Sequence, residues 1–345
     1  MKSTLKRTWA EIDLSALSYN YRKIREYIGE KIGFFGIVKA DAYGHGAVEV
    51  ASAIYKIADC FAVAHVEEGV KLRRAGIDKD ILVLLPALDK DECERAVFHR
   101  LTLTVESAYD IAFLENVCEN MNSSVLVHLK INTGMNRLGV CGEKEIKDTL
   151  NVFANSKRVI LDGFYTHFAN PENKNSFLVA QNKFLLANNL VKGYNKKVTA
   201  HASASGGFIR GAHYDMVRIG ILLYGYKPFE SDYVNVAPAM KVYAPRLRLR
   251  SLKGGETALY GDKIVMDDVD LNLIAYGYAD GLWRKNVSGQ FYDRCMDVTA
   301  VTDCEEVGLG VPVMIDADKL AKEYGTISYE VLTKCALRAK KVYVR

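Results

Sequence analysis

Eight short apolar runs follow one another between residues 34 and 219, and their spacing restricts the possible fold more than any other feature of the chain. Each run has the length of a buried strand, and segments rich in helix-forming residues separate them, for example at 67–74 and 89–98. Alternating strands and helices favour a parallel sheet, and eight repeats are the number that closes such a sheet into a barrel. The runs lie at 34–38, 60–64, 81–85, 101–105, 125–131, 159–165, 198–202 and 215–219.

Beyond about Ala237 the pattern changes to short alternating runs that glycine-containing turns interrupt. This rhythm is typical of a small β domain, with a single helical segment expected at 316–324. We therefore predict an α/β chain of two domains. An N-terminal (β/α)8 barrel would cover residues 1–236, and a mostly-β C-terminal domain would cover residues 237–345.

Charge and cysteine content narrow the class of protein. The formal net charge of +4 comes from mixed acidic and basic residues, so nucleic-acid binding is not indicated. No apolar run approaches the roughly 18 residues of a membrane span. The seven cysteines include no Cys-x-x-Cys pair, which argues against a zinc site and a disulfide framework and favours the reducing cytoplasm. A soluble piece of a larger membrane protein is the alternative.

Lys39 stands at the end of the apolar run 34–38, where a barrel enzyme keeps its chemistry. A lysine in a pocket without water loses its proton more readily and can form a Schiff base with the carbonyl of a substrate or of pyridoxal phosphate. Tyr43 follows one turn later and could hold a phosphate. These two residues predict an aldehyde-cofactor site, with a solvated lysine as the alternative.

Three motifs resemble the alanine racemase family. Residues 38–46 (Val-Lys-Ala-Asp-Ala-Tyr-Gly-His-Gly) are similar to its cofactor-lysine motif, residues 130–139 to its Lys-x-Asp-Thr-Gly-Met-x-Arg-Leu-Gly, and residues 277–281 to its Gly-Tyr-Ala-Asp-Gly. The resemblance implies pyridoxal 5'-phosphate bound at Lys39. It also implies that the first 10–14 residues pair with the C-terminal domain.

Racemisation requires an acid/base group on each face of the planar intermediate, so Lys39 needs a second residue opposite it. By resemblance this residue is Tyr278, which in the family comes from the other subunit of a homodimer. An ordinary tyrosine has a pKa of about 10 and needs a nearby cation to lose its proton near neutral pH. The resemblance suggests Arg137 as that cation and as a ligand of the substrate carboxylate.

Further roles follow from the resemblance alone. Lys130 would position Arg137 and could be carbamylated, although Asn132 stands where the family usually has an acidic residue. His167, in Thr-His-Phe-Ala, would lie along the cofactor ring and bond an arginine. Met296, in Cys-Met-Asp, would offer its backbone amide to the substrate carboxylate.

The cofactor phosphate and pyridine ring would meet two other segments. In Val-Arg-Ile-Gly-Ile, the backbone amides of Gly220 and Ile221 would donate to the phosphate, as would the Ser205 hydroxyl. Arg218 would face the pyridine nitrogen. A permanently charged guanidinium disfavours protonation of that nitrogen and so limits side reactions.

The C-terminal part departs from the family pattern. Only 18 positions separate Tyr278 from Met296, fewer than expected, and Leu337 stands where some members have a tyrosine. These differences concern the shape of the site and therefore its specificity.

The predicted function is interconversion of L- and D-alanine, with D-alanine supplied to peptidoglycan. Racemisation of serine or another amino acid, as in a vancomycin-resistance type serine racemase, is the nearest alternative. Three other classes are alternatives, and one feature separates each from a racemase. A non-catalytic pyridoxal-phosphate carrier would not need Tyr278, and a decarboxylase would release carbon dioxide. A cofactor-free aldolase would not need the contacts proposed for the cofactor phosphate.

Overall fold

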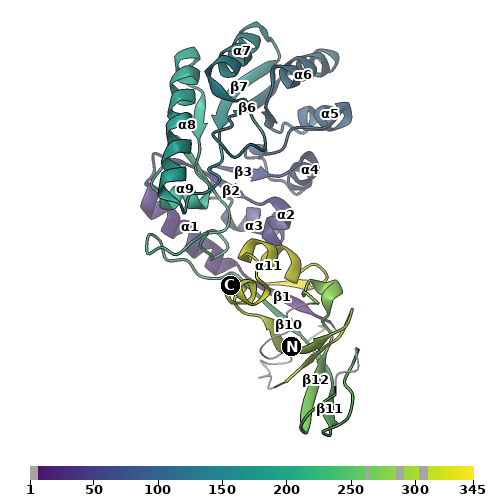
Figure 1. The fold of residues 1–345 in the computed structure, drawn as a ribbon. Coiled ribbons are helices and arrows are strands. Elements are labelled where there is room, and N and C mark those ends of the chain that lie inside the picture. Colours follow the sequence, from purple (N-terminus) through teal and green to yellow (C-terminus); the bar gives the residue numbers. More distant parts are fainter. Residues whose placement is uncertain (1–6, 261–263, 285–290, 303–309) are drawn as a thin grey trace. The chain divides into compact units, whose positions relative to one another are not determined.

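The computed structural model describes residues 7–260, 264–284, 291–302 and 310–345. The chain divides into two compact units (Figure 1). One contains residues 17–42 and 47–236, here called the barrel unit, and the other contains residues 1–16, 43–46 and 237–345, here called the β unit.

The barrel unit contains eight parallel strands, one at each of the predicted apolar runs. Two ladders, β4-β3-β2-β9 and β5-β6-β7-β8, make up the sheet. A parallel bridge from Leu82 to Thr102 joins them on one side, and the Arg218 amide donates to the Ser203 carbonyl on the other. The predicted (β/α)8 barrel is confirmed. The strands are β2 (Gly33–Ile37), β3 (Cys60–Val63), β4 (Ile81–Val83), β5 (Leu103–Val105), β6 (Val125–Lys130), β7 (Val159–Tyr165), β8 (Thr199–His201) and β9 (Met216–Ile219).

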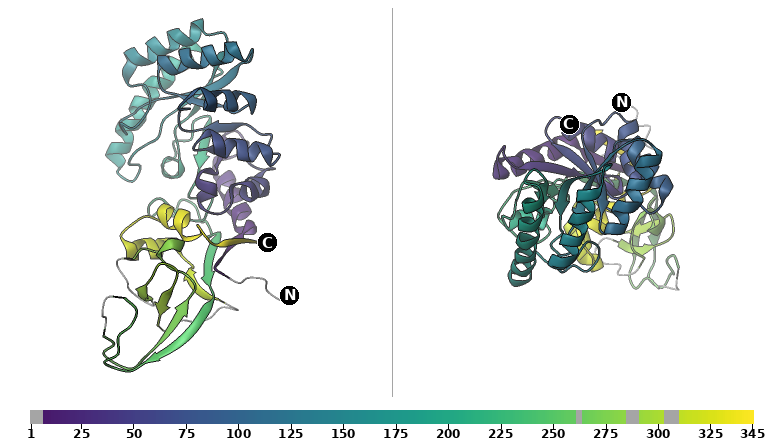
Figure 2. Two further views of the ribbon diagram at one scale, coloured as in Figure 1. Left: turned by 90° about the vertical axis from the view of Figure 1, so that its right-hand side faces the viewer. Right: turned by 90° about the horizontal axis from the view of Figure 1, so that it is seen from above.

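Helices surround these strands, as the view from above shows (Figure 2, right). Several begin at a side-chain cap: Asp89 accepts from the Glu92 amide, and Ser107 accepts from the Asp110 amide. The strands β3, β4 and β5 are buried along their whole length, so the core fills the space inside the sheet and between sheet and helices. The helices are α1 (Leu14–Ile28), α2 (Lys39–Tyr43), α3 (Ala47–Ile54), α4 (Val66–Arg74), α5 (Lys90–Phe98), α6 (Ala108–Asn120), α7 (Gly142–Asn155), α8 (Lys174–Tyr194) and α9 (Ser205–Ile209).

Among its described residues, the β unit has two four-stranded sheets. In one, β1 (Trp9–Asp13) pairs with β10 (Met240–Ala244) and β16 (Lys340–Val344), and β15 (Val311–Met314) pairs with β10. The other has the order β11-β12-β14-β13, with β11 (Arg246–Leu252), β12 (Val269–Ile274), β14 (Thr299–Val301) and β13 (Phe291–Arg294). A small apolar cluster around Leu271 and Ala300 lies on this second sheet.

One expectation for the β unit was wrong, because two α-helices and not one occur among its described residues. The expected helix is α10 (Ala317–Tyr324), which Asp316 caps. The second, α11 (Ser328–Cys335), has only eight residues, no side-chain cap at its start, and the β-branched residues Val331 and Thr333. A segment of this length and composition cannot be told from a strand by periodicity, and its packing against α10 makes it a helix.

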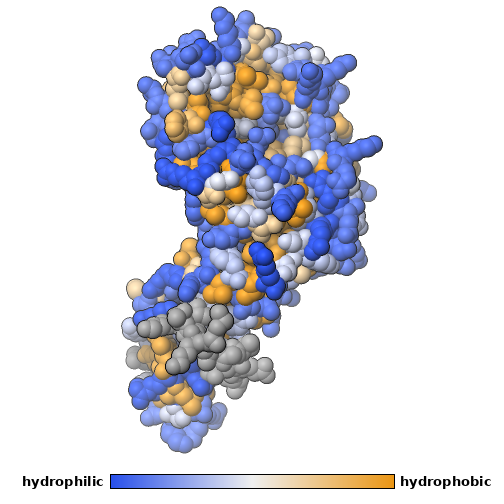
Figure 3. Space-filling view, turned by 180° about the vertical axis from the view of Figure 1, so that it is seen from behind, coloured by the Kyte–Doolittle hydropathy of each residue, from blue (hydrophilic) through white to orange (hydrophobic). Residues whose placement is uncertain are grey.

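Hydrophobic residues show between hydrophilic ones on both units in the face drawn in Figure 3. Among the helices of the described residues, none is long and apolar enough to cross a membrane.

Candidate active site

The predicted site residues fall into two sets, one in each unit. In the barrel unit, the predicted site residues stand at or beyond the C-terminal ends of the parallel strands, which meet at one edge of a barrel. This set comprises Lys39, Lys130, Arg137, His167, Ser205, Arg218, Gly220 and Ile221. Tyr43, Tyr278 and Met296 belong to the β unit.

Lys39 opens an unusual backbone segment. Ala40, Asp41, Ala42 and Tyr43 all have φ between 51° and 56°, so α2 is a left-handed turn formed by non-glycine residues. The conformation is energetically unfavourable for such residues. Contacts from outside the turn hold it, because Glu68 accepts from the Ala40 amide and Asp41 accepts from the Ala47 amide.

Lys39 is partly buried, and its amine lies near two arginines. Burial lowers its pKa from the ordinary lysine value, the guanidinium groups of Arg137 and Arg218 lower it further, and the Glu68 carboxylate opposes them. A lowered pKa makes more of the neutral, nucleophilic amine available near neutral pH. Schiff-base formation, the chemistry predicted for Lys39, requires the neutral amine.

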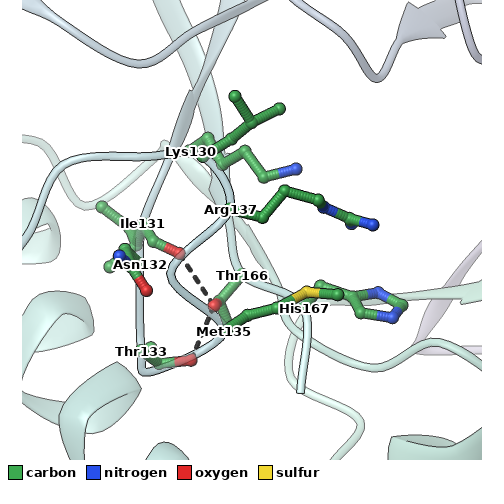
Figure 4. Close-up of a pocket in the computed structure, with 9 residues that line it drawn as sticks. Lys130, Ile131, Asn132, Thr133, Met135, Arg137, Thr166 and His167 are labelled. Atoms are coloured by element: carbon green, nitrogen blue, oxygen red, sulfur yellow. Dashed lines mark hydrogen bonds between the residues drawn. The ribbon is translucent and has the colours of Figure 1, made fainter. Parts of the chain in front are cut away.

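Lys130 and Arg137 line a small pocket with Thr133, Thr166 and His167. In Figure 4 the side chains of Lys130, Arg137 and His167 all extend toward the same side. The Thr166 hydroxyl donates to the Ile131 carbonyl and accepts from the Thr133 hydroxyl, and these bonds fix the loop that carries them.

The charge of Lys130 is poorly tolerated in this pocket. The residue is 6% exposed, and burial together with Arg218 and Arg137 lowers its pKa to about 8. Its ammonium lies 4.8 Å from the centre of the Tyr165 ring. A neutral amine at this position can react with carbon dioxide, which is the chemistry that carbamylation needs.

The Asn132 side chain holds the turn of the loop before Arg137 by hydrogen bonds. Its Oδ1 accepts from the amides of Gly134 and Asn136, and its Nδ2 donates to the Asn136 side chain. An aspartate could accept the same two backbone bonds but could not donate the third. The asparagine therefore keeps the turn while leaving one negative charge out of the cluster.

His167 is held neutral. Burial and the four cations Arg218, Arg137, Lys130 and Lys39 lower its pKa to about 3. A neutral imidazole can lie beside a ring and exchange one hydrogen bond at each nitrogen.

Arg218 is held by hydrogen bonds to strand ends and to a second histidine, His201. Its guanidinium donates to His201 Nδ1 at 2.9 Å and to the carbonyls of His201, Thr166 and Ala202. In the described part of the chain Arg218 is thus bonded to His201, a histidine that the sequence did not single out. The bond from His167 to an arginine, which the resemblance implied, stays a prediction. His201 sits at the end of β8 in the motif that supplies Ser205, so its strand-end position was the available signal.

The two segments expected to bind the cofactor phosphate follow the ends of β8 and β9. Ser205 starts α9, is buried, and accepts from the Leu222 amide at 3.4 Å. Gly220 and Ile221 lie immediately before Leu222 and are also buried. The predicted hydroxyl and backbone donors are thus brought together.

In the β unit, Tyr278 and Met296 lie on adjacent segments. The Tyr278 amide donates to the Cys295 carbonyl and the Ala279 amide donates to the Met296 carbonyl. Arg338 joins the same segments through Asp280 and Asp297. Tyr278 is 37% exposed and Met296 53% exposed, so both side chains can meet a ligand or another chain.

Tyr43 is buried in the β unit beside Tyr329, with ring centres 6.0 Å apart. Burial raises its pKa well above the ordinary tyrosine value. Its hydroxyl therefore keeps its proton and can act as a hydrogen-bond donor.

The barrel residues fit an anionic aldehyde cofactor. Four cations, Lys39, Lys130, Arg137 and Arg218, gather there. The two arginines add to burial in lowering the pKa of both lysines, while Glu68 raises that of Lys39 and Glu106 that of Lys130. A phosphate or carboxylate would relieve this repulsion. Among the described residues, no cluster of histidine, cysteine and acidic side chains could hold a metal ion.

Comparison with known proteins gives a consistent result over the whole chain. Residues 12–228 match the family model of the alanine racemase N-terminal domain, and residues 239–343 match that of the alanine racemase C-terminal domain. The alanine racemase of Carboxydothermus hydrogenoformans is 32% identical, with 99% of this chain and 100% of the relative covered. Alanine racemase 1 of Bacillus subtilis is 31% identical, with 98% and 93% covered.

Solved structures agree. Alanine racemase from Clostridium difficile 630 superimposes with a TM-score of 0.89 at 30% identity, covering 99% of this chain and 97% of that chain. Alanine racemase from Bacillus anthracis with bound L-Ala-P superimposes with a TM-score of 0.90 at 28% identity, covering 98% and 95%.

Proposed function

Because this chain belongs to the alanine racemase family, we propose that it interconverts L- and D-alanine with Lys39 and Tyr278 as its two acid/base groups. The family assignment confirms the resemblance inferred from the motifs and makes the chain an isomerase. The D-alanine formed would serve peptidoglycan synthesis, which is the standard role of the family.

The cationic cluster around Lys39 is the observation that carries this proposal. The lowered pKa of Lys39 supplies a neutral amine that can take the Cα proton on one face, and Tyr278 would serve the other. Pyridoxal 5'-phosphate, when bound at Lys39, supplies the electron sink for the carbanion. Proton exchange on two faces is racemisation.

The other residues would bind and orient. Ser205, Tyr43 and the amides of Gly220 and Ile221 would hold the phosphate, and Arg218 would stand at the pyridine nitrogen. His167 would lie along the ring. Arg137, positioned by Lys130, would bind the substrate carboxylate together with the Met296 amide.

We further propose a homodimer in which Tyr278 and Met296 of one subunit complete the site of the other. Two observations support it. The residues required for the reaction are divided between the two units, and Tyr278 and Met296 remain exposed on the β unit.

Racemisation of L-alanine and of L-serine by the purified protein with added pyridoxal phosphate tests the proposal, with a D-amino-acid oxidase readout. We expect rapid turnover of alanine. Tyr278→Phe should lower kcat/KM for racemisation about 10²- to 10⁴-fold in both directions, because each turnover uses one group as base and the other as acid. A loss of less than about 10-fold would remove Tyr278 from its role.

A further inference from the structure

Three side chains, His201, His128 and Asp162, form a series of polar contacts between Arg218 and the protein surface. Arg218 Nη1 lies 2.9 Å from His201 Nδ1, His201 Nε2 lies 2.7 Å from His128 Nδ1, and His128 Nε2 lies 3.5 Å from Asp162 Oδ2. His201 is fully buried and His128 is 3% exposed, whereas the Asp162 side chain is 51% exposed. The series therefore runs from the cofactor-facing arginine through the barrel to water.

The direction of every bond in this series follows from the first. A guanidinium has no acceptor, so His201 Nδ1 must accept and its Nε2 must carry the proton. His201 Nε2 then donates to His128 Nδ1, which places the His128 proton on Nε2, facing the Asp162 carboxylate. Both rings are neutral in this arrangement, and their tautomers are determined.

A second proton on the His128 ring would disturb the whole series. It would place an N–H of His128 against the N–H of His201, and a change of the His201 tautomer would place another N–H against Arg218. The charged and titratable groups around the two rings are Asp162, Arg218, Lys130 and Tyr165. Burial first, and then the cation Arg218, the neighbouring His128 and the cation Lys130, lower the pKa of His201 well below its ordinary value. The surroundings thus favour the neutral form of the inner ring.

The backbone is shaped to admit the His128 ring. The ladder between β6 and β7 pairs Val127 with Leu161 and then His128 with Gly163, so Asp162 is the extra residue of a β-bulge. A side chain at position 163 would place its Cβ 2.6 Å from His128 Cε1 and Nε2. The bulge turns Asp162 toward the imidazole, and the glycine leaves room for that ring.

Aromatic rings enclose the two imidazoles. Tyr165 stacks on His201 with ring centres 4.9 Å apart and planes 6° apart, and Phe35 lies against both histidines. Such walls exclude water, so each ring nitrogen depends on the partner named above. Loss of one partner would leave a buried polar group unsatisfied.

We propose that His128 and Asp162 are positioning residues, which fix the tautomer and place of His201 and thereby aim Arg218 at the cofactor pyridine. The role of Arg218 at the pyridine rests on the proposed function. The arrangement resembles an aspartate that holds a catalytic histidine in one tautomer, extended by a second ring.

The first test reads the tautomers without cofactor and without catalysis. In cofactor-free protein labelled with ¹⁵N-histidine, we expect both His128 and His201 to show a protonated Nε2 and an unprotonated Nδ1. A coupling between His201 Nε2 and His128 Nδ1 should also appear. Either ring in the other tautomer, or a doubly protonated His128 at neutral pH, would overturn the proposal. This result is independent of whether the protein racemises alanine.

The second test uses variants in the cofactor-loaded protein. His128→Met removes the acceptor of His201 and should weaken pyridoxal-phosphate binding, measured by equilibrium dialysis, about 10-fold. His128→Gln, whose amide can accept from His201 and donate to Asp162, should recover most of this loss. Asp162→Asn should give a smaller loss and faster solvent exchange of the His201 Nε2 proton.

Asp148→Asn is the matched control, because it removes one carboxylate from the exposed side of α7, where Asp148 pairs with Lys144. This control should change neither the affinity for pyridoxal phosphate nor the solvent exchange of the His201 Nε2 proton. Wild-type cofactor affinity in His128→Met would overturn the proposal, as would equal losses in Asp162→Asn and the control. If His128→Met does not fold, the surface substitution Asp162→Asn and the tautomer measurement still test the proposal.

Discussion

At the barrel edge, burial and neighbouring like charges lower the pKa values of single residues. Lys39, Lys130, His167 and Arg218 all have lowered pKa values, and burial is the largest cause for each of them. The pKa of Arg218 falls to about 10, so this residue stays charged near neutral pH while the lysines come closer to neutrality. A permanent cation beside neutral amines suits the roles proposed for them.

The pKa of Lys130 leads to a prediction about stability. Its folded value of about 8 lies below the ordinary 10.5, so between these pH values the unfolded chain binds more protons than the folded one. The free energy of unfolding contributed by Lys130 therefore rises as the pH increases. Lys130→Met should stabilise the cofactor-free protein at pH 7, and this advantage should shrink by about 2–3 kcal/mol by pH 10.

Urea unfolding in carbonate-free buffer, with both proteins at pH 7 and pH 10, measures this difference. Exclusion of carbonate keeps Lys130 as a free amine. An advantage of Lys130→Met that stays constant or grows with pH would contradict the lowered pKa.

At the scale of elements, the left-handed turn α2 carries the lysine and contains no glycine. An alanine in this conformation is less stable than glycine by roughly 1–2 kcal/mol, and greater freedom of glycine in the unfolded chain offsets part of that. Ala40 is exposed, so no cavity forms on its replacement. Ala40→Gly should therefore raise the free energy of unfolding by about 0.5–1 kcal/mol.

The matched control is Ala112→Gly, at an exposed position of the right-handed helix α6. The same change there should lower the free energy of unfolding by about 1 kcal/mol. Losses of similar size at both positions would show that residue 40 is not left-handed.

The contact between the Tyr278 and Met296 segments gives a prediction for the β unit. A Cβ at Gly277 would lie 2.2 Å from the Met296 carbonyl oxygen and 2.5 Å from that of Cys295. Gly277→Ala should separate the two segments and reduce racemisation at least about 10-fold, because a misplaced catalytic group costs about that much or more.

Cofactor absorbance should remain in Gly277→Ala, since the proposed cofactor residues except Tyr43 lie in the barrel unit. Gly193→Ala, at a helical position with open space around it, serves as the control and should keep full activity. Loss of the cofactor band together with activity in Gly277→Ala would argue against this division of roles.

Much of the element pattern could be predicted, because strands buried on both sides appear as continuous apolar runs. The left-handed turn could not be predicted, since Lys-Ala-Asp-Ala-Tyr contains ordinary right-handed helix formers and contacts from Glu68 and Ala47 impose the other hand. The series His201, His128 and Asp162 also escaped prediction. Its members come from three strands and share no local motif, and a bulge and a glycine bring them together.

At the scale of the whole molecule, the groups proposed for one reaction are divided between the two units. Lys39 belongs to the barrel unit, while Tyr278 and Met296 belong to the β unit. Motif resemblance could assign these residues to one active site, but no pattern in a single sequence tells whether they come from the same chain. The answer depends on how the subunits assemble.

Complementation between two inactive variants tests the central claim most directly. Lys39→Ala should lose the cofactor absorbance band and Tyr278→Phe should lose most activity. If each site takes Lys39 from one subunit and Tyr278 from the other, a mixed dimer contains one intact site. Equal amounts of the two variants, dissociated and reassociated at random, should then recover about a quarter of the wild-type racemisation rate. Recovery of no activity, with mixed dimers verified by mass spectrometry, would contradict a two-base site shared between subunits.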